Sequence, residues 1–118
     1  MKNRNDPDQL NINDDLTSDQ PVEQITVEEA LQRAVHYHNT GEFGYAVELY
    51  TQILDASPNH PEAMHLLGVL GSQFGQHEEA IDLISQAIEI SPNQPVYYCN
   101  LGKVLQTHGK FEEAIQSY

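Results

Sequence analysis

From Thr26 onward, apolar and polar residues are interleaved in segments that have the pattern of helices with one buried face. Thr26, with Glu29 three residues later, has the sequence of a capping box and predicts a helix start. Pro61 and Pro95 suit the first position of two later helices, because a missing N–H costs nothing there. The pattern therefore predicts an all-α fold.

The helical pattern recurs at an interval of 34 residues. Gly41, Gly75 and Gly109 share this register, and each is expected to turn the chain tightly after a first helix. Second helices are then expected to begin near Gly44, His77 and Lys110. Other residues that keep the register are Ala46, Ala80 and Ala114, Ser57–Asn59 and Ser91–Asn93, and Leu67 and Leu101. Several residue types repeating together predict stacked helical hairpins that share a core.

Small residues fall where the two helices of each hairpin would approach closely, at Ala34, Gly68 and Gly102 on the first helices and at Ala46, Ala80 and Ala114 on the second. The pattern resembles the tetratricopeptide repeat, which has a period of about 34 residues. In the middle unit the signature falls on Met64, Leu67, Gly68, Gly71, Ala80, Ile84 and Pro92. In the third it falls on Tyr98, Leu101, Gly102, Leu105, Ala114 and Tyr118. The first unit matches at Ala30, Ala34, Tyr37, Ala46, Tyr50 and Pro58, and it has Arg33 where a leucine is expected.

The resemblance implies an α-solenoid of stacked antiparallel helix hairpins with about two and a half repeats. The repeats cover residues 27–60, 61–94 and 95–118, within a domain of residues 25–118. Residues 1–24 are rich in Asn, Asp and Gln and are expected to form a disordered polar leader. The third repeat stops at Tyr118, two turns into its second helix, which favours a fragment of a longer array; pairing of this apolar edge with another copy and fraying of the end are the alternatives.

Charge and composition exclude several kinds of partner. Five Lys and Arg against 18 Asp and Glu give a net charge of −13, which disfavours nucleic acid and anionic membrane surfaces. No apolar run approaches the ~18–20 residues of a membrane span, and the first residues lack the apolar core of a secretory signal, so a cytoplasmic location is expected. The single Cys99 agrees with a reducing compartment. Neither the histidines nor the acidic leader has the spacing of a metal site, so no metal or cofactor is expected.

In tetratricopeptide arrays the first helix of each repeat lines the concave surface. Carried over by register, the resemblance implies a peptide-binding groove formed by Leu31, Val35, His38, Glu62, His65, Val69, Ser72, Cys99, Asn100, Lys103 and Gln106. This mixed, mildly apolar lining suits an extended or helical peptide segment. Leu31 and Val35 stand where chaperone-binding members have the polar residues of a carboxylate clamp, so that clamp is not expected.

The repeats are also similar to the N-terminal arrays of bacterial proteins related to O-linked N-acetylglucosamine transferase. Asn100 lies where those arrays place an asparagine ladder that holds a peptide backbone, whereas Gln32 and Leu66 occupy the equivalent positions of the earlier repeats. Similar repeats also precede methyltransferase and sulfotransferase domains, so the similarity does not fix a chemistry. No catalytic domain fits within 118 residues.

The sequence therefore predicts a protein–protein interaction module that binds a peptide in its groove, as part of a longer protein and without catalysis of its own. One alternative is the substrate-recognition array of a bacterial glycosyltransferase of the O-linked N-acetylglucosamine type. A second alternative is a scaffold that self-associates through its exposed C-terminal edge.

Overall fold

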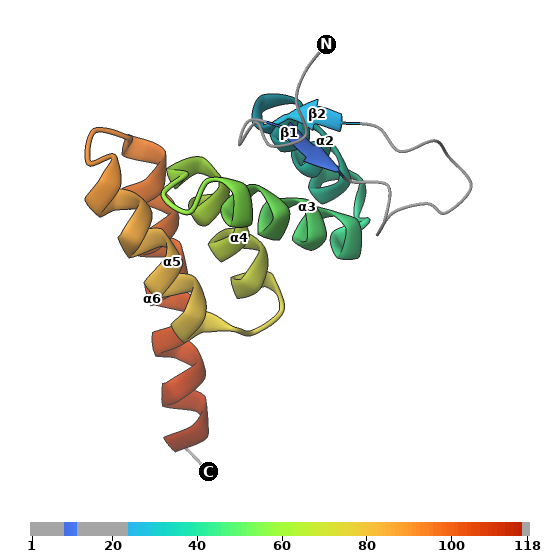
Figure 1. Ribbon diagram of the computed structural model, residues 1–118. Helices are drawn as coiled ribbons and strands as arrows, with labels where there is room; N and C mark the ends of the chain where they lie inside the picture. The colour runs from blue at the N-terminus through green and yellow to red at the C-terminus, as the bar shows by residue number, and fades with distance from the viewer. Residues whose placement is uncertain (1–8, 12–23, 117–118) are drawn as a thin grey trace. The chain divides into compact units, whose positions relative to one another are not determined.

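A computed structural model describes residues 9–11 and 24–116 of the chain (Figure 1). The helices are α2 (Val27–Thr40), α3 (Phe43–Ala56), α4 (Pro61–Gln73), α5 (His77–Ile90) and α6 (Pro95–Gln116), and two short strands are β1 (Gln9–Asn11) and β2 (Gln24–Thr26). The predicted all-α class and its helical hairpins are confirmed. The chain divides into two compact units, residues 1–63 and 64–118. Most of the predicted leader, and Tyr118, lie outside the described residues.

In the first unit, α2 and α3 pack against each other as an antiparallel hairpin (Figure 1). Helix α2 begins as the capping box predicts, because the hydroxyl of Thr26 accepts a hydrogen bond from the backbone N–H of Glu29 at 3.1 Å. The buried side chains of this hairpin are mostly small on α2 and mostly large on α3: Val27, Ala30 and Ala34, and Ala46, Leu49, Tyr50 and Ile53. The small residues let the two backbones approach, and the large ones fill the remaining space.

A two-stranded antiparallel ribbon precedes α2, and the sequence pattern did not predict it. Leu10 pairs with Ile25, and the flanking residues of β1 and β2 pair in the same register. Ile25 is buried, and both strands contact the hairpin. Four residues of the expected leader, Gln9–Asn11 and Gln24, thus lie in paired strands, and the apolar side chain of Ile25 in β2 packs on the core.

Two of the three repeated glycines turn the chain in the same way. Gly41 and Gly75 have φ angles of 84° and 83°, in the left-handed region that favours glycine. In each bend the following residue donates to a carbonyl five positions earlier: the N–H of Glu42 to Tyr37 at 2.9 Å, and the N–H of Gln76 to Gly71 at 3.0 Å. The same bond at a 34-residue interval confirms these two predicted bends.

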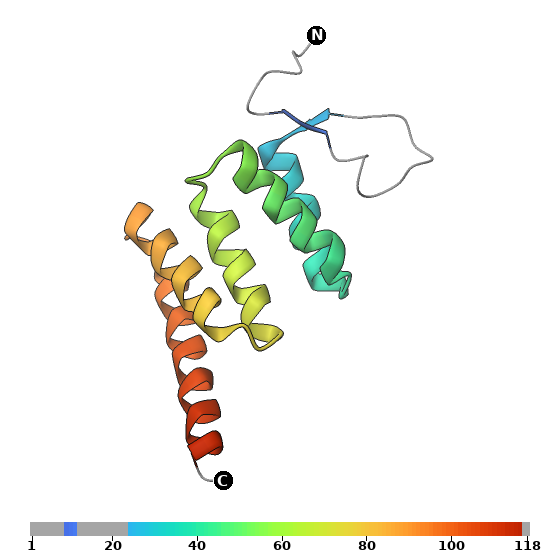
Figure 2. The same cartoon turned by 60° about the horizontal axis from the view of Figure 1, so that its bottom comes forward.

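The predicted bend at Gly109 is wrong. Helix α6 continues through this glycine to Gln116, and α6 runs beside α5 and past the first residues of α5 (Figure 2). Tyr97, Leu101, Val104, His108 and Phe111 recur every three or four residues, so a single helical stripe continues across Gly109. The ring of Phe111 meets that of His77 on α5 at 6.0 Å. This stripe, with Phe111 against α5, accompanies a helix that stays continuous where the earlier repeats bend.

A pair of alanine variants tests this correction. Gly109→Ala should raise the free energy of unfolding by about 0.5–1 kcal/mol, because Gly109 is helical and a Cβ there meets nothing within 4 Å. Gly75→Ala also meets nothing within 4 Å, but its φ of +83° is unfavourable for alanine, so that variant should lose about 1 kcal/mol. Urea unfolding followed by circular dichroism measures both. A loss of stability in Gly109→Ala would mean that this glycine turns the chain after all.

Candidate functional site

The described part of the second unit brings two predicted groove residues into direct contact. The side-chain nitrogen Nδ2 of Asn100 on α6 lies 2.8 Å from Nε2 of His65 on α4, a hydrogen bond between the first helices of successive repeats. His65 is only 2% exposed, and its ring stacks on that of Tyr97, with centroids 4.4 Å apart and planes tilted by 31°. His65 therefore lies beneath the surface that it was expected to line, whereas Asn100 stays half-buried at its edge.

Val69 and Ser72, the next predicted residues of α4, are also partly enclosed. Val69 packs against the buried cluster of Ala80, Ile84 and Val104. The hydroxyl of Ser72 donates to the carbonyl oxygen of Val69 at 2.8 Å, within its own helix. These two residues support the helix and its core more than they offer groups to a ligand.

On α6 the remaining predicted residues are open to solvent. Cys99, Lys103 and Gln106 are exposed, and their spacing of four and three residues places them on one side of the helix. Asn100 adjoins this row. The second unit therefore presents a thiol, a cation and two amides along one helix, a set able to contact the polar backbone of a peptide.

In the first unit, Leu31 and Val35 are half-buried on α2, and His38 is tied to the core. Nδ1 of His38 lies 3.2 Å from the hydroxyl of Tyr50, which is fully buried. Burial, and to a lesser degree the negative charge of Glu62, raises the pKa of Tyr50 to about 12. Glu62, another predicted groove residue, is half-buried at the start of α4. The buried phenol thus fixes the position of His38.

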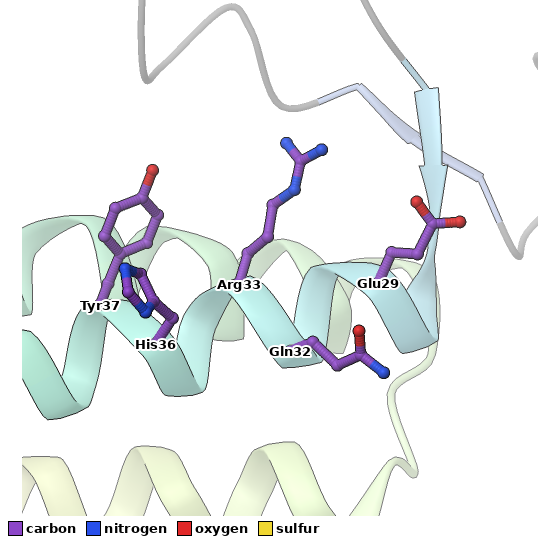
Figure 3. Close-up of a pocket in the computed structure, with 5 residues that line it drawn as sticks. All are labelled: Glu29, Gln32, Arg33, His36 and Tyr37. Atoms are coloured by element: carbon purple, nitrogen blue, oxygen red, sulfur yellow. The ribbon is translucent and has the colours of Figure 1, made fainter.

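A hollow of about 440 Å³ lies on a different side of α2 (Figure 3). Its lining consists of Glu29, Gln32, Arg33, His36 and Tyr37. Glu29, Arg33 and Tyr37 are spaced four residues apart and project from the same side of the helix (Figure 3). Leu31 is two positions from both Glu29 and Arg33, about 200° around the helix, so this polar face is separate from the predicted groove. Arg33, where the repeat family has leucine, makes this face of the first hairpin polar.

A second hollow, of about 320 Å³, lies where the start of α5 meets α6. His77 and His108 face each other there with ring centroids 5.8 Å apart. Over residues 9–11 and 24–116, no three His, Cys, Asp or Glu side chains lie close enough together to hold a metal ion. None of the predicted groove residues lines either hollow.

In residues 9–11 and 24–116, no helix has both the length and the apolar character needed to cross a bilayer.

Hairpins of 34 residues, equivalent glycine bends and a close approach of helices at Gly68 define an α-helical repeat protein. The family model described as TPR repeat matches residues 73–109. Residues 73–109 therefore match a tetratricopeptide repeat, and the chain has the stacked helical hairpins of tetratricopeptide-repeat proteins. A comparison with curated proteins finds no match.

Several solved structures share this fold. A mutant of the Thermobaculum terrenum O-GlcNAc transferase matches with a TM-score of 0.70 and 30% identity, over 77% of this chain and 18% of that chain. The C-terminal TPR-containing domain of a putative FK506-binding protein of Plasmodium falciparum matches with a TM-score of 0.69 and 21% identity, over 74% of this chain and 58% of that one. The second TPR domain of Spaghetti (RPAP3), bound to an HSP90 peptide, matches with a TM-score of 0.65 and 21% identity, over 76% of this chain and 83% of that one.

These comparisons support conclusions of different scope. The matches at 21% identity show the fold alone. The repeats resemble those of the transferase at 30% identity, but this chain spans less than a fifth of that protein. A domain of tetratricopeptide repeats is generally non-catalytic.

Sequence reasoning missed the pairing of His65 with Asn100. The two residues are 35 positions apart, whereas the 34-residue register identifies equivalent positions and not positions in contact. The first helices of neighbouring repeats are expected to lie beside each other, which limits the possible contacts between them. To choose the contacting residues, one must also know how each helix is rotated about its axis, and the sequence does not state that.

Proposed function

We propose that this chain is a protein–protein interaction module that binds a peptide segment along the first helices of its repeats. The observation that carries the proposal is the exposed row of Cys99, Lys103 and Gln106 on α6, with the amide of Asn100 beside it. Amides can pair with both the N–H and the C=O of a peptide backbone, and a lysine adds a charge-assisted donor. By register, the family resemblance also assigns Leu31 and Val35 on α2 and Glu62 on α4 to the residues that contact a ligand.

A solved neighbour supports the proposed kind of ligand, since the second TPR domain of Spaghetti (RPAP3) holds an HSP90 peptide. Here Leu31 and Val35 are half-buried apolar residues, which favours a ligand with apolar side chains at that end. We also propose a cytoplasmic location, which agrees with the single cysteine of the chain.

The proposal predicts specific losses of binding. Peptides are first selected with the immobilised full chain from a displayed random library, and their affinities are then measured by fluorescence anisotropy. Asn100→Ala should raise the dissociation constant about tenfold, which is the effect of losing one or two hydrogen bonds. Lys103→Glu should raise it as well, because it removes a donor and reverses a charge. Asn93→Ala, an equal change at an exposed asparagine in the turn before α6, should bind as the wild type does. Unchanged affinity in both groove variants would show that the surface is misplaced.

A second candidate is the substrate-recognition array of a bacterial glycosyltransferase of the O-linked N-acetylglucosamine type. The 30% identity with the Thermobaculum terrenum O-GlcNAc transferase, over 77% of this chain, favours it. Sequencing the gene beyond the codon for Tyr118 decides between the two. An α/β domain that binds a nucleotide sugar would support this candidate, and a different type of domain or a stop codon would count against it.

Self-association is the remaining alternative. Tyr98, Leu105 and Phe111 on α6 are each about half exposed, at 49%, 49% and 53%. A second copy that covered these side chains would remove apolar surface from water. Sedimentation velocity at a series of concentrations tests this, and a constant monomer mass would exclude it.

A further inference from the structure

We propose that His65 is a positioning residue, which holds the side-chain amide of Asn100 in the orientation that binds a peptide backbone. The inference rests on the proposed peptide-binding function and deepens it. His65 is only 2% exposed, so it would affect binding through Asn100 and not by contact with the ligand.

The hydrogen bond between the two side chains fixes the tautomer of the imidazole. Nδ2 of an asparagine is a donor only, so Nε2 of His65, 2.8 Å away, is the acceptor. An imidazole nitrogen accepts only when it carries no proton, and the neutral ring then has its proton on Nδ1. His65 is thus a neutral ring whose lone pair on Nε2 points at the amide.

Packing keeps this acceptor in one place. The imidazole stacks on Tyr97 with ring centroids 4.4 Å apart, and Tyr97 is itself only 2% exposed. Tyr97 and Asn100 are three residues apart on α6, so one helix supplies both the support beneath the imidazole and the amide that it holds. Neither ring can turn without disturbing the interior of the unit.

A fixed amide binds a peptide better than a rotating one. The terminal torsion of an asparagine has broad, nearly two-fold preferences, so a free amide samples many orientations. The bond to His65 uses one N–H of Asn100 and leaves the carbonyl oxygen and the second N–H for a ligand. A peptide C=O and N–H can pair with these two groups only in one orientation of the amide. Holding that orientation in advance lowers the entropy lost on binding.

A purely structural role for the same bond is the rival explanation, because a buried imidazole needs a hydrogen-bond partner in any case. The two roles differ in what a variant changes. A structural bond affects stability and leaves the affinity of the folded chain unaltered, whereas a positioning bond affects affinity through Asn100.

The first measurement uses the wild-type chain without ligand. Nitrogen-15 NMR of the full chain should show Nε2 of His65 as an unprotonated nitrogen and Nδ1 as protonated. A protonated Nε2 would mean that the amide of Asn100 is turned the other way, with its oxygen accepting, and would overturn the proposed orientation. This test needs no peptide and no variant.

The second measurement uses peptides selected on the wild-type chain from the displayed library. His65→Phe keeps an aromatic ring over Tyr97 and removes the acceptor, and it should weaken binding about tenfold. In the double variant with Asn100→Ala no further loss of affinity is expected, because both changes remove the same contribution, that of the amide held by His65. His65→Gln, whose side-chain oxygen can accept from Asn100, should recover part of the affinity. Thermal unfolding of each variant by circular dichroism verifies that the binding data refer to folded protein.

The outcomes separate this inference from the proposed function. If the wild-type chain selects no peptide, the proposed function fails. If Asn100→Ala weakens binding and a folded His65→Phe does not, the function stands and the positioning role of His65 is overturned. Additive losses in the double variant would likewise overturn it, since His65 would then act independently of Asn100.

Discussion

Gly68→Leu should lower the free energy of unfolding by about 3 kcal/mol, through overpacking between α4 and α5. A Cβ added at Gly68 would lie 2.9 Å from Cγ1 of Ile84 and 3.1 Å from the carbonyl oxygen of Ala80. The first contact can be relieved by a small rotation of a side chain. The second is with backbone, so relief requires α4 to move away from α5, which exposes the cluster of Ala80, Ile84 and Val104.

The chain contains a matched control for this change. Gly102 occupies the equivalent position one repeat later, yet a Cβ there meets nothing within 4 Å, and the residue is exposed on α6. Gly102→Leu should therefore stabilise the chain by about 0.5 kcal/mol, because leucine is the better helix former. The two variants have the same composition, so the difference between their urea midpoints reports packing alone. If Gly68→Leu were as stable as Gly102→Leu, the close approach of α4 and α5 would be refuted.

Local signals in the sequence were sufficient for much of this fold. A threonine cap at Thr26, prolines at the first positions of α4 and α6, and glycines at two bends each act within one helical turn. Such signals need no knowledge of the rest of the chain. The 34-residue interval then identified which helices form equivalent hairpins, and Gly68 confirmed that a small residue stands at a close contact.

The failure at Gly109 shows where local signals stop. Gly75 and Gly109 are each followed within a few residues by a pair of glutamates, so the local sequence is nearly identical. The bend at Gly75 is stabilised by burial of Ala80, Ile84 and Ala87 along the helix that follows. Whether a second helix finds such a partner is a tertiary question. The ribbon of β1 and β2 and the bond between His65 and Asn100 depend on tertiary contacts in the same way.

Exposure of the proposed surface also depends on this tertiary level. Repeat register placed His65 and Asn100 together among the predicted groove residues, but burial separates their roles. His38 in the first unit is similarly tied to a buried partner, the hydroxyl of Tyr50. In both units a histidine of a first helix thus contacts both the predicted binding surface and the interior. In the first unit the interior partner is Tyr50, and its role can be tested directly.

The free energy of unfolding should fall by up to about 3 kcal/mol as the pH rises from 10 to 12, because of Tyr50. Burial and the charge of Glu62 raise the pKa of this phenol from its ordinary value of 10.0 to about 12. Between these values the unfolded chain releases the phenolic proton and the folded chain keeps it. The unfolded state then binds fewer protons, so the free energy of unfolding decreases with pH. The contribution of Tyr50 is fully present below pH 10 and is lost as the pH passes through about 12.

Tyr50→Phe isolates this effect. At neutral pH the variant should lose about 1 kcal/mol, because the hydrogen bond to Nδ1 of His38 is removed while the ring stays buried. Between pH 10 and 12 its free energy of unfolding should decline less steeply than that of the wild type, so the two curves converge and then cross. Urea titrations at a series of pH values measure both curves. Parallel curves across this range would show that water reaches the phenol, and that His38 is not held by a buried partner.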